Sequence, residues 1–230
     1  MSAFTLAEFA HQTSQKDATN DAFELESPNM LEVRLDGRVW TKIGTMIAYY
    51  GDVQFKREGA FENGLGHFLK KAISSEGTAL TKAEGQGRLY LADNAKRITI
   101  LRLNGDSIIV NGNDVLAFES TIKHEITMMK KISGMMSGGL FNVKLSGTGL
   151  IAFTSHGPPM TLIVSPSHPL TCDPNATVAW SAGLKTELKS AVTLKTLIGR
   201  GTGETFQQRF SGEGIVVVQP YEEVIHPGKR

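Results

Sequence analysis

Apolar and polar residues alternate along much of this chain, and the alternation predicts strands. The pattern is plainest after the glycine pair at 138–139, where Phe141, Val143 and Leu145 alternate with polar residues. A period of two places one set of side chains on a single face of a strand. This strand leads into Gly147-x-Gly149, and a second apolar run follows directly.

The same features return along the chain and predict an internal repeat. An aliphatic–alanine–aromatic triplet occurs at 47–49, 116–118 and 178–180, at offsets of 69 and 62 residues. A GxG pair before an apolar run occurs at 85–87, 147–149 and 212–214. Val33–Gly37 also resembles Leu101–Gly105. Several independent features at similar offsets indicate repeated structural units. We predict one domain over residues 1–230, with approximate repeats at 18–84, 85–146 and 147–221.

Each unit is expected to consist of short strands. In the second unit, the segments 88–91, 98–103, 107–110 and 115–119 are rich in β-branched, aliphatic or aromatic residues. They are separated by Asp93-Asn94, Asn104-Gly105 and Asn111-Gly112, which favour hairpin turns. Prolines are confined to turns and edges in sheets, which places Pro158, Pro159, Pro166, Pro169 and Pro174 between the strands of the third unit.

These patterns predict an all-β fold, a β-sandwich of three tandem repeats with short helical connectors. The first and last segments should complete one sheet together. The aromatic residues of the three triplets, Tyr49, Phe118 and Trp180, should be buried at equivalent places.

One connector in each unit has apolar residues at helical rather than strand spacing. In the first unit they fall at 65, 68, 69, 72 and 73, which is the i, i+3, i+4, i+7, i+8 spacing of an amphipathic helix. Lysines accompany all three connectors. Their apolar residues either close the sandwich and join subunits, or bind a membrane surface or a protein partner. The candidate interaction residues are Phe68, Leu69, Ile73, Met135, Met136, Leu197 and Ile198.

Composition removes several classes of function. Lys+Arg is 24 and Asp+Glu is 23 in 230 residues, so no global charge attracts nucleic acid. Aromatic residues make up only 7% of the chain, which gives RNA bases few stacking partners. The six histidines lack metal-ligand spacing, and the single cysteine, Cys172, lies in no catalytic motif. We therefore predict no enzymatic activity, catalytic residue, metal or cofactor.

The GxG pairs could suggest a phosphate-binding loop. A dinucleotide site, however, requires a strand, GxGxxG and a helix in that order. Each pair here precedes another strand-like segment, at 89–91, 150–153 and 215–218. We interpret the glycines as serving tight turns or close backbone packing.

Three motifs carry a family resemblance: Gly138-Gly-Leu-Phe-x-x-Lys-Leu-Ser-Gly-x-Gly149, Gly64-Leu-Gly-x-x-Leu-Lys-Lys-Ala72 and Gly212-Glu-Gly-x-Val-Val-Val-Gln-Pro220. Together they resemble the altered-inheritance-of-mitochondria family of mitochondrial biogenesis proteins and its bacterial relatives. The match extends from about Phe23 to Glu223. The resemblance implies a fold like that of the tryptophan-RNA-binding attenuation protein, and a homotrimer. It supplies no catalytic residue.

The expected function is a non-enzymatic assembly or interaction module that forms a homo-oligomer and contacts a membrane or a protein partner through its connectors. The alternative is a small-molecule-binding protein with sites between repeats, by analogy with the attenuation protein. Residues 1–17 lack a secretory signal pattern, and the first arginine is Arg34, so a cytoplasmic location is expected.

Overall fold

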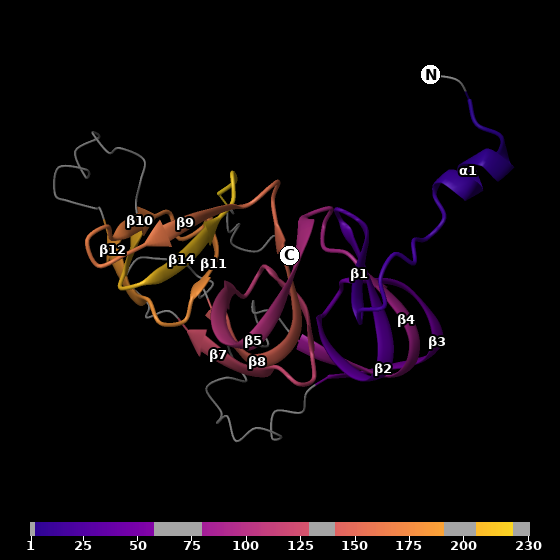
Figure 1. Ribbon diagram of the computed structural model, residues 1–230, viewed down its shortest axis with the longest axis horizontal. Helices are drawn as coiled ribbons and strands as arrows, with labels where there is room; N and C mark the ends of the chain where they lie inside the picture. Colours follow the sequence, from indigo (N-terminus) through magenta and orange to yellow (C-terminus); the bar gives the residue numbers. More distant parts are fainter. Residues whose placement is uncertain (1–2, 58–79, 129–140, 191–205, 223–230) are drawn as a thin grey trace, which may run out of the picture.

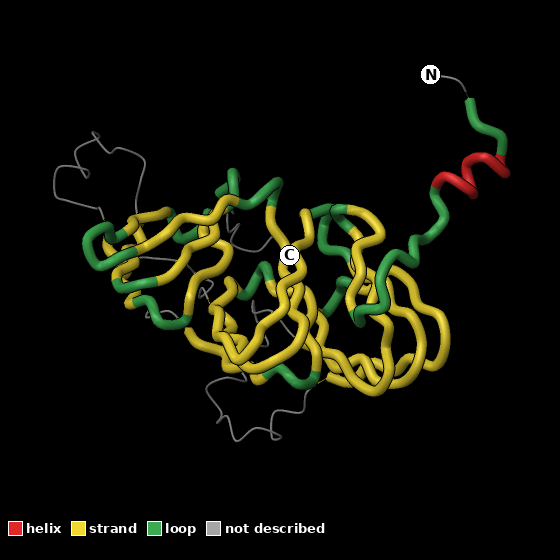
Figure 2. Tube along the Cα trace, in the orientation of Figure 1, coloured by secondary structure: helices red, strands yellow, loops and turns green. Residues whose placement is uncertain are grey.

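The computed structural model describes residues 3–57, 80–128, 141–190 and 206–222, and nearly all of its regular structure is strand (Figures 1 and 2). The strands are β1 (Phe23–Ser27), β2 (Met30–Lys42), β3 (Met46–Arg57), β4 (Leu80–Leu91), β5 (Arg97–Asn111), β6 (Val115–Glu119), β7 (Lys123–Met128), β8 (Phe141–Ser155), β9 (Met160–Val164), β10 (Leu170–Cys172), β11 (Thr177–Ser181), β12 (Lys185–Ser190), β13 (Phe206–Ser211) and β14 (Gly214–Val218). Helix α1 (Leu6–Gln12), capped by Thr5 and Glu8, extends away from the strands. The all-β prediction is confirmed for these residues.

The described strands form two antiparallel sheets. An 11-stranded sheet follows the order β3-β4-β2-β6-β8-β5-β11-β14-β9, with β1 added to β2 and β7 added to β8. A 3-stranded sheet follows the order β10-β13-β12. The first and last strands share the large sheet but are not neighbours, because β1 pairs with β2 while β14 pairs with β9 and β11. Strands β3 and β9 end this sheet, at opposite ends of the molecule (Figure 1).

Three trios of strands in the large sheet share one pairing register. They are β3-β4-β2, β6-β8-β5 and β11-β14-β9, here called the first, second and third trio. In each trio the aromatic residue of the triplet pairs with the residue two positions after the second glycine of the GxG motif. These pairs are Tyr49–Leu89, Phe118–Ile151 and Trp180–Val216.

A bulge falls at the same place in each trio. The register shifts between Met46 and Ala48, between Val115 and Ala117, and between Thr177 and Ala179. The extra residue is in every case the aliphatic member of the triplet. A bulge lets two residues oppose one and bends the strand locally. The expected repeat boundaries at 84/85 and 146/147 fall inside β4 and β8, so the first and second trios each include residues from both sides of a boundary.

In the first trio the GxG glycines allow close backbone approach, whereas Gly212 of the third motif lies in the bend between β13 and β14. All six have φ between +117° and +158°, a region that residues with a Cβ rarely adopt. A Cβ on Gly87 would also collide with the carbonyl oxygen of Tyr50, and one on Gly85 with that of Asp52. The GxG motif of the first trio lies within the continuous strand β4, and that of the second trio lies within β8.

The hairpin turn predicted at Asn104-Gly105 is wrong. Residues 97–111 form the single strand β5, and the dipeptide produces only a register shift between Asn104 and Asp106. Gly105 has φ +87°, so it absorbs the extra residue as a bulge without reversing the chain. The prediction that prolines lie between strands is confirmed, since none of the five prolines from 158 to 174 lies in a strand.

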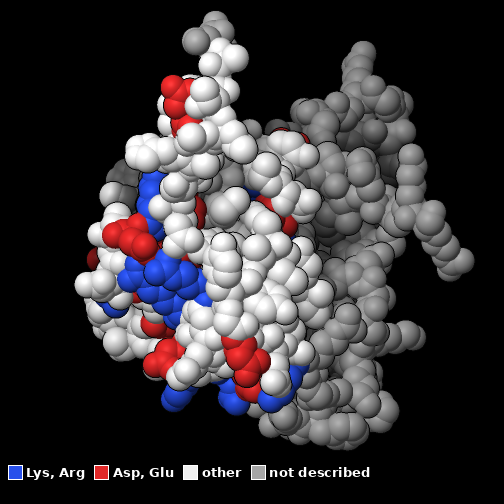
Figure 3. All heavy atoms as spheres, turned by 90° about the vertical axis from the view of Figure 1, so that its right-hand side faces the viewer, with Lys and Arg blue, Asp and Glu red and all other residues white. Residues whose placement is uncertain are grey.

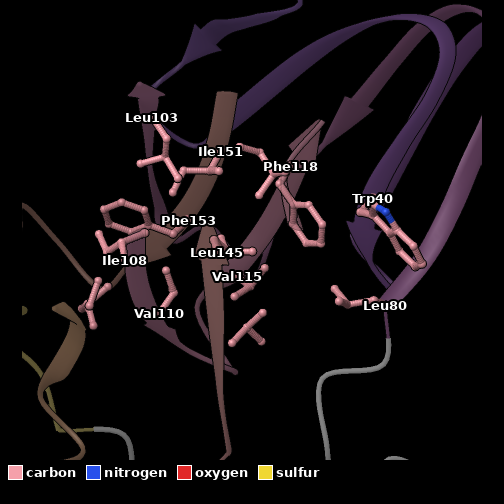
Figure 4. Close-up of a cluster of buried hydrophobic side chains, with 14 of the residues drawn as sticks. Trp40, Leu80, Leu103, Ile108, Val110, Val115, Phe118, Leu145, Ile151 and Phe153 are labelled. Carbon is pink, nitrogen blue, oxygen red and sulfur yellow. The ribbon is translucent and has the colours of Figure 1, made fainter. Parts of the chain in front are cut away.

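The core follows the triplets, with one exception. Phe118 is 0% exposed and Trp180 is 3% exposed. Trp40 of β2 pairs with Phe118 and stacks on it, with 6.0 Å between ring centroids (Figure 4). Tyr49 is 46% exposed, so its predicted burial is wrong. The reason is topological: β3 ends the sheet, and no described strand covers Tyr49 as β2 covers Phe118.

Replacing Gly87 with Ala should destabilise the protein through both its positive φ and the collision with Tyr50. A loss of about 1–3 kcal/mol in the free energy of unfolding is expected, the scale of a strained backbone position. Chemical denaturation measures this loss. Gly183→Ala is the matched control, since a Cβ there meets nothing within 4 Å. Equal effects of the two substitutions would contradict this account of the motif.

The two aromatic residues Phe118 and Tyr49 should respond very differently to truncation. Phe118→Ala should lower the free energy of unfolding by about 3–5 kcal/mol, as is usual for a core aromatic. Tyr49→Ala removes a side chain that is 46% exposed and should cost well under half as much. Urea titrations of the isolated monomer would measure both, and comparable losses would show that Tyr49 is a core residue after all.

Candidate functional site

The seven candidate interaction residues, Phe68, Leu69, Ile73, Met135, Met136, Leu197 and Ile198, lie outside the described residues. The structure describes the bases of their connectors. Each base is a cross-strand pair at the end of two antiparallel strands: Arg57–Thr81, Met128–Phe141 and Ser190–Phe206. Each connector therefore joins two neighbouring strands.

The three bases occupy similar positions in the pairing register. Phe141 and Phe206 both lie six residues before the first glycine of their GxG motif, and Thr81 lies four residues before its own. The connectors consequently leave corresponding parts of their units. The apolar and lysine-bearing connector sequences are therefore attached at repeated positions.

A buried carboxylate, Glu32 of β2, forms the centre of a polar cluster in the first trio. Its side chain is 0% exposed. The hydroxyl of Tyr90 donates to Glu32 Oε2 at 3.0 Å, and Nη1 of Arg88 lies 3.5 Å from the same oxygen. Nε of Arg34 lies 3.4 Å from Oε1. A buried carboxylate needs such partners, because an unpaired charge in a low dielectric is costly.

The chain segment before β1 is tied to this cluster. Glu24 accepts hydrogen bonds from the backbone N–H of Ala18 at 2.6 Å and from Nη2 of Arg34 at 3.0 Å. The carboxylate of Asp17 accepts a hydrogen bond from Nη1 of Arg88 at 2.8 Å. The cluster thus fixes residues 17–19 against the sheet.

The chemistry of this cluster is that of a structural clamp. Its carboxylates form ion pairs with its guanidinium groups. The sequence contains a signal for this cluster that hydrophobic alternation alone does not reveal. Glu32 and Arg34 are separated by two positions on β2, and they pair with Tyr90 and Arg88, which are separated by two on β4. Residues at i and i+2 share one face of a strand, so the four side chains meet.

A second set of buried charges joins β2 to two turns. Nζ of Lys42 lies 2.8 Å from Oδ2 of Asp93 and donates to the backbone carbonyl of Asn113 at 2.6 Å. Nζ of Lys96 donates to Oδ1 of Asp114 at 3.0 Å. These contacts link the turn after β4 to the turn after β5, and so connect the first trio to the second.

The remaining chemical candidates are the possible metal ligands and Cys172. Among the described residues, no three of His, Cys, Asp and Glu gather closely enough to hold a metal ion. Cys172 lies on β10 and is half-buried. Burial, and secondarily the charge of Asp173, raise the pKa of its thiol. A raised pKa lowers the thiolate fraction and therefore the nucleophilicity at neutral pH.

Strand β3 presents an exposed apolar edge, which includes Tyr49, the one residue of this strand that was predicted to be buried. Its exposed large side chains are Met46 at 44%, Ile47 at 51%, Tyr49 at 46%, Tyr50 at 66% and Phe55 at 38%. The end of the molecule that carries β3 has a broad surface free of Lys, Arg, Asp and Glu, with charged groups gathered to its sides (Figure 3). A large exposed apolar surface on a soluble domain usually marks an interaction site.

Comparison with known proteins gives a family and a fold. The sequence profile of the family described as "Mitochondrial biogenesis AIM24" matches residues 23–221. The crystal structure of protein SPYM3_0169 from Streptococcus pyogenes superposes with a TM-score of 0.67 at 23% identity, covering 87% of this chain and 92% of that chain. No curated protein matches the chain. In the described part of the chain, no helix is long and apolar enough to cross a membrane.

The Tyr90 hydroxyl should make the stability of the protein depend on alkaline pH. Burial, then the hydrogen bond to Glu32 and its charge, raise the pKa of Tyr90 from 10.0 to about 12. The folded state therefore favours the neutral phenol. Its contribution is complete below pH 10 and is lost as the pH rises through about 12.

Denaturation at a series of alkaline pH values would measure this dependence. Tyr90→Phe should reduce the fall in stability over that window, and it should cost about 1 kcal/mol at neutral pH through the lost hydrogen bond. Tyr221→Phe is the control, because Tyr221 is 46% exposed. If Tyr90→Phe and the wild type lose stability in parallel above pH 10, the buried cluster does not control this ionisation.

Proposed function

Because the chain belongs to the mitochondrial biogenesis family AIM24, whose profile spans residues 23–221, we propose that it acts without catalysis, as an assembly and interaction module. In this proposal the chain is a β-sandwich of three tandem repeats and assembles as a homotrimer. Its connectors contact an anionic membrane surface or an apolar protein partner.

One observation carries the proposal: the three connectors are based on equivalent hairpin ends. The cross-strand pairs at these bases, Arg57–Thr81, Met128–Phe141 and Ser190–Phe206, repeat within the same strand arrangement. Each connector sequence places apolar residues beside lysines. Repeated weak sites on one scaffold reinforce one another, because linked sites gain effective concentration. An oligomer would multiply this gain.

The chemistry of the described residues is consistent with a module that works by contact. The charged clusters at Glu32 and Lys96 consist of paired groups inside the sheet. Side chains such as Trp40, Phe118 and Trp180 occupy the places where neighbouring trios meet. These places are where the alternative, a small-molecule protein with sites between repeats, would need its ligand.

A liposome flotation assay tests the membrane form of this proposal. The wild type should float with anionic vesicles at low salt, and flotation should fall at high salt as screening weakens the lysine contacts. A Phe68→Ser, Met136→Ser, Ile198→Ser variant should lose flotation, because each substitution removes apolar area from one connector. No flotation of the wild type, or equal flotation of the two proteins, would contradict the membrane proposal.

A matched control uses the exposed apolar residues of the N-terminal segment. Phe4, Leu6 and Phe9 around helix α1 are 58%, 84% and 54% exposed. A variant with all three replaced by Ser should float like the wild type. If this variant loses flotation while the connector variant keeps it, the N-terminal helix and not the connectors binds the vesicle.

A further inference from the structure

The triplet is exposed in the first trio and buried in the other two. Ile47 and Tyr49 are 51% and 46% exposed, and Ala48 between them is also exposed. The corresponding residues at 116–118 and 178–180 are all between 0% and 3% exposed. The three triplets have the same register, the same bulge and similar residues, so their difference in burial comes from their surroundings.

A strand of the preceding trio covers each buried triplet. Strand β2 pairs with β6 at the first junction, where Trp40 lies opposite Phe118. Strand β5 pairs with β11 at the second junction, where Ile109 lies opposite Trp180. Strand β3 is at the end of the sheet and has only β4 as a neighbour among the described strands.

The aromatic contacts show what is missing from β3. At the first junction Phe118 and His124 lie 5.2 Å apart, and Trp40 packs on both, at 6.0 and 4.7 Å between ring centroids. In the first trio the corresponding pair, Tyr49 and Phe55, lies 6.2 Å apart. Among the described residues no third aromatic ring is recorded on this pair, and both side chains are partly open to solvent.

The opposite end of the structure carries the matching half of a junction. In β2 and β5, the segments Val39–Thr41 and Ile108–Val110 form the two junctions. The first residue of each segment pairs with the residue two positions before the first glycine of the GxG motif in its trio. The last residue of each segment pairs with the residue four positions before that glycine. Leu170–Cys172 of β10 has this same relation to Gly212, since Leu170 pairs with Phe210 and Cys172 with Gln208.

This third segment is uncovered. Strand β10 is at the end of its sheet. Thr171 is exposed, and Leu170 and Cys172 are half-buried. The residues that correspond to Leu170 in the two internal junctions, Val39 and Ile108, are only 2% and 6% exposed. The molecule therefore carries one open half-junction on β3 and the complementary half-junction on β10. The two half-junctions lie at opposite ends of the molecule, too far apart to pair with each other (Figure 1).

We propose that β10 of one copy of this chain pairs antiparallel with β3 of a second copy, in the register of the two internal junctions. That register places Thr171 opposite Tyr49, Leu170 opposite Tyr50 and Cys172 opposite Ala48. The contact is head-to-tail, so each copy uses a different surface toward each neighbour, and closure of the series gives a ring. The inference rests on the homo-oligomer of the proposed function and specifies its interface.

The side-chain rows at the junctions agree with this pairing. At the first junction, Lys82 pairs with Trp40 across one strand pair, and its Nζ lies 5.0 Å from the Trp40 ring centroid. At the corresponding position of β10 and β13, Arg209 pairs with Thr171. Thr171 is much smaller than Trp40, which leaves the Arg209 guanidinium room beside the Tyr49 ring of the second copy. An arginine over an aromatic face is a favourable contact.

A single introduced cysteine tests the register, because Cys172 is the only cysteine in the chain. Ala48→Cys should form disulfides between copies under mild oxidation, since directly opposed strand residues lie within disulfide range. A head-to-tail contact lets the links continue from copy to copy, so a non-reducing gel should show a ladder beyond the dimer. Two controls should give no ladder: Ala48→Cys combined with Cys172→Ser, and Tyr49→Cys, whose side chain points to the other face of β3.

The mass in solution provides the second measurement. The wild type should be a multimer of the 25.0 kDa chain by light scattering at tens of micromolar. Tyr49→Lys should reduce the mass to that of one chain, because a charge on an edge strand opposes pairing. Tyr221→Lys is the matched control, since Tyr221 is also 46% exposed but lies outside both half-junctions.

The outcomes separate this interface from the wider proposal. A ladder with Ala48→Cys, together with dissociation of Tyr49→Lys only, supports the pairing. A multimer that survives Tyr49→Lys and gives no ladder overturns it, while the homo-oligomer of the proposed function stands. A wild-type mass of one chain overturns both.

Discussion

The antiparallel pairing of each triplet strand with the apolar residues that follow its GxG motif is the constraint from which the rest of the structure follows. The aliphatic residue of the triplet is the extra residue of a bulge, so the alanine and the aromatic residue are delivered to fixed partners. The glycines permit positive φ on the opposing strand. In the first trio Gly87 also permits an approach to Tyr50 that a Cβ would prevent. In the first trio, pairing, bulge and close backbone approach therefore occur together.

Because each trio has one edge that covers and one edge that is covered, trios add in a single direction. Strand β2 of the first trio covers β6 of the second, and β5 of the second covers β11 of the third. A finite series of such units leaves one edge of each kind unmatched, as in other repeat architectures. An exposed edge strand is a hazard for a soluble protein, since its free backbone groups can template further pairing. A defined partner for β3 would remove that hazard.

The buried charges have a structural role that complements the apolar core. Glu32 is fully buried, yet Tyr90, Arg34 and Arg88 surround it within hydrogen-bonding or ion-pairing distance. Removing one partner of such a cluster is far more damaging than the net stability of the cluster suggests, because the other charge stays buried and unpaired. Lys42 and Lys96 bind the turns beside the first junction in a similar way. Paired charges at these places favour one alignment of the trios over a slipped one.

The sequence by itself determined the all-β class, the three triplets at their offsets, and the glycines that each trio requires. These are local properties: alternation, chain reversal and φ are set by the residues concerned and their immediate neighbours. Residue type alone did not separate a turn from a bulge at Asn104-Gly105, because the same dipeptide fits both. Tertiary structure decided that β5 continues through it to pair with β8.

Only the tertiary structure decided which triplet is buried. Tyr49, Phe118 and Trp180 have similar local sequences and the same register, and yet Tyr49 alone is open to solvent. The burial of a residue depends on the strand that packs beside it, and that strand comes from a distant part of the chain. For Tyr49, no described strand takes this position. The sequence could identify the repeated unit, but the order of the trios in the sheet determined where the series ends.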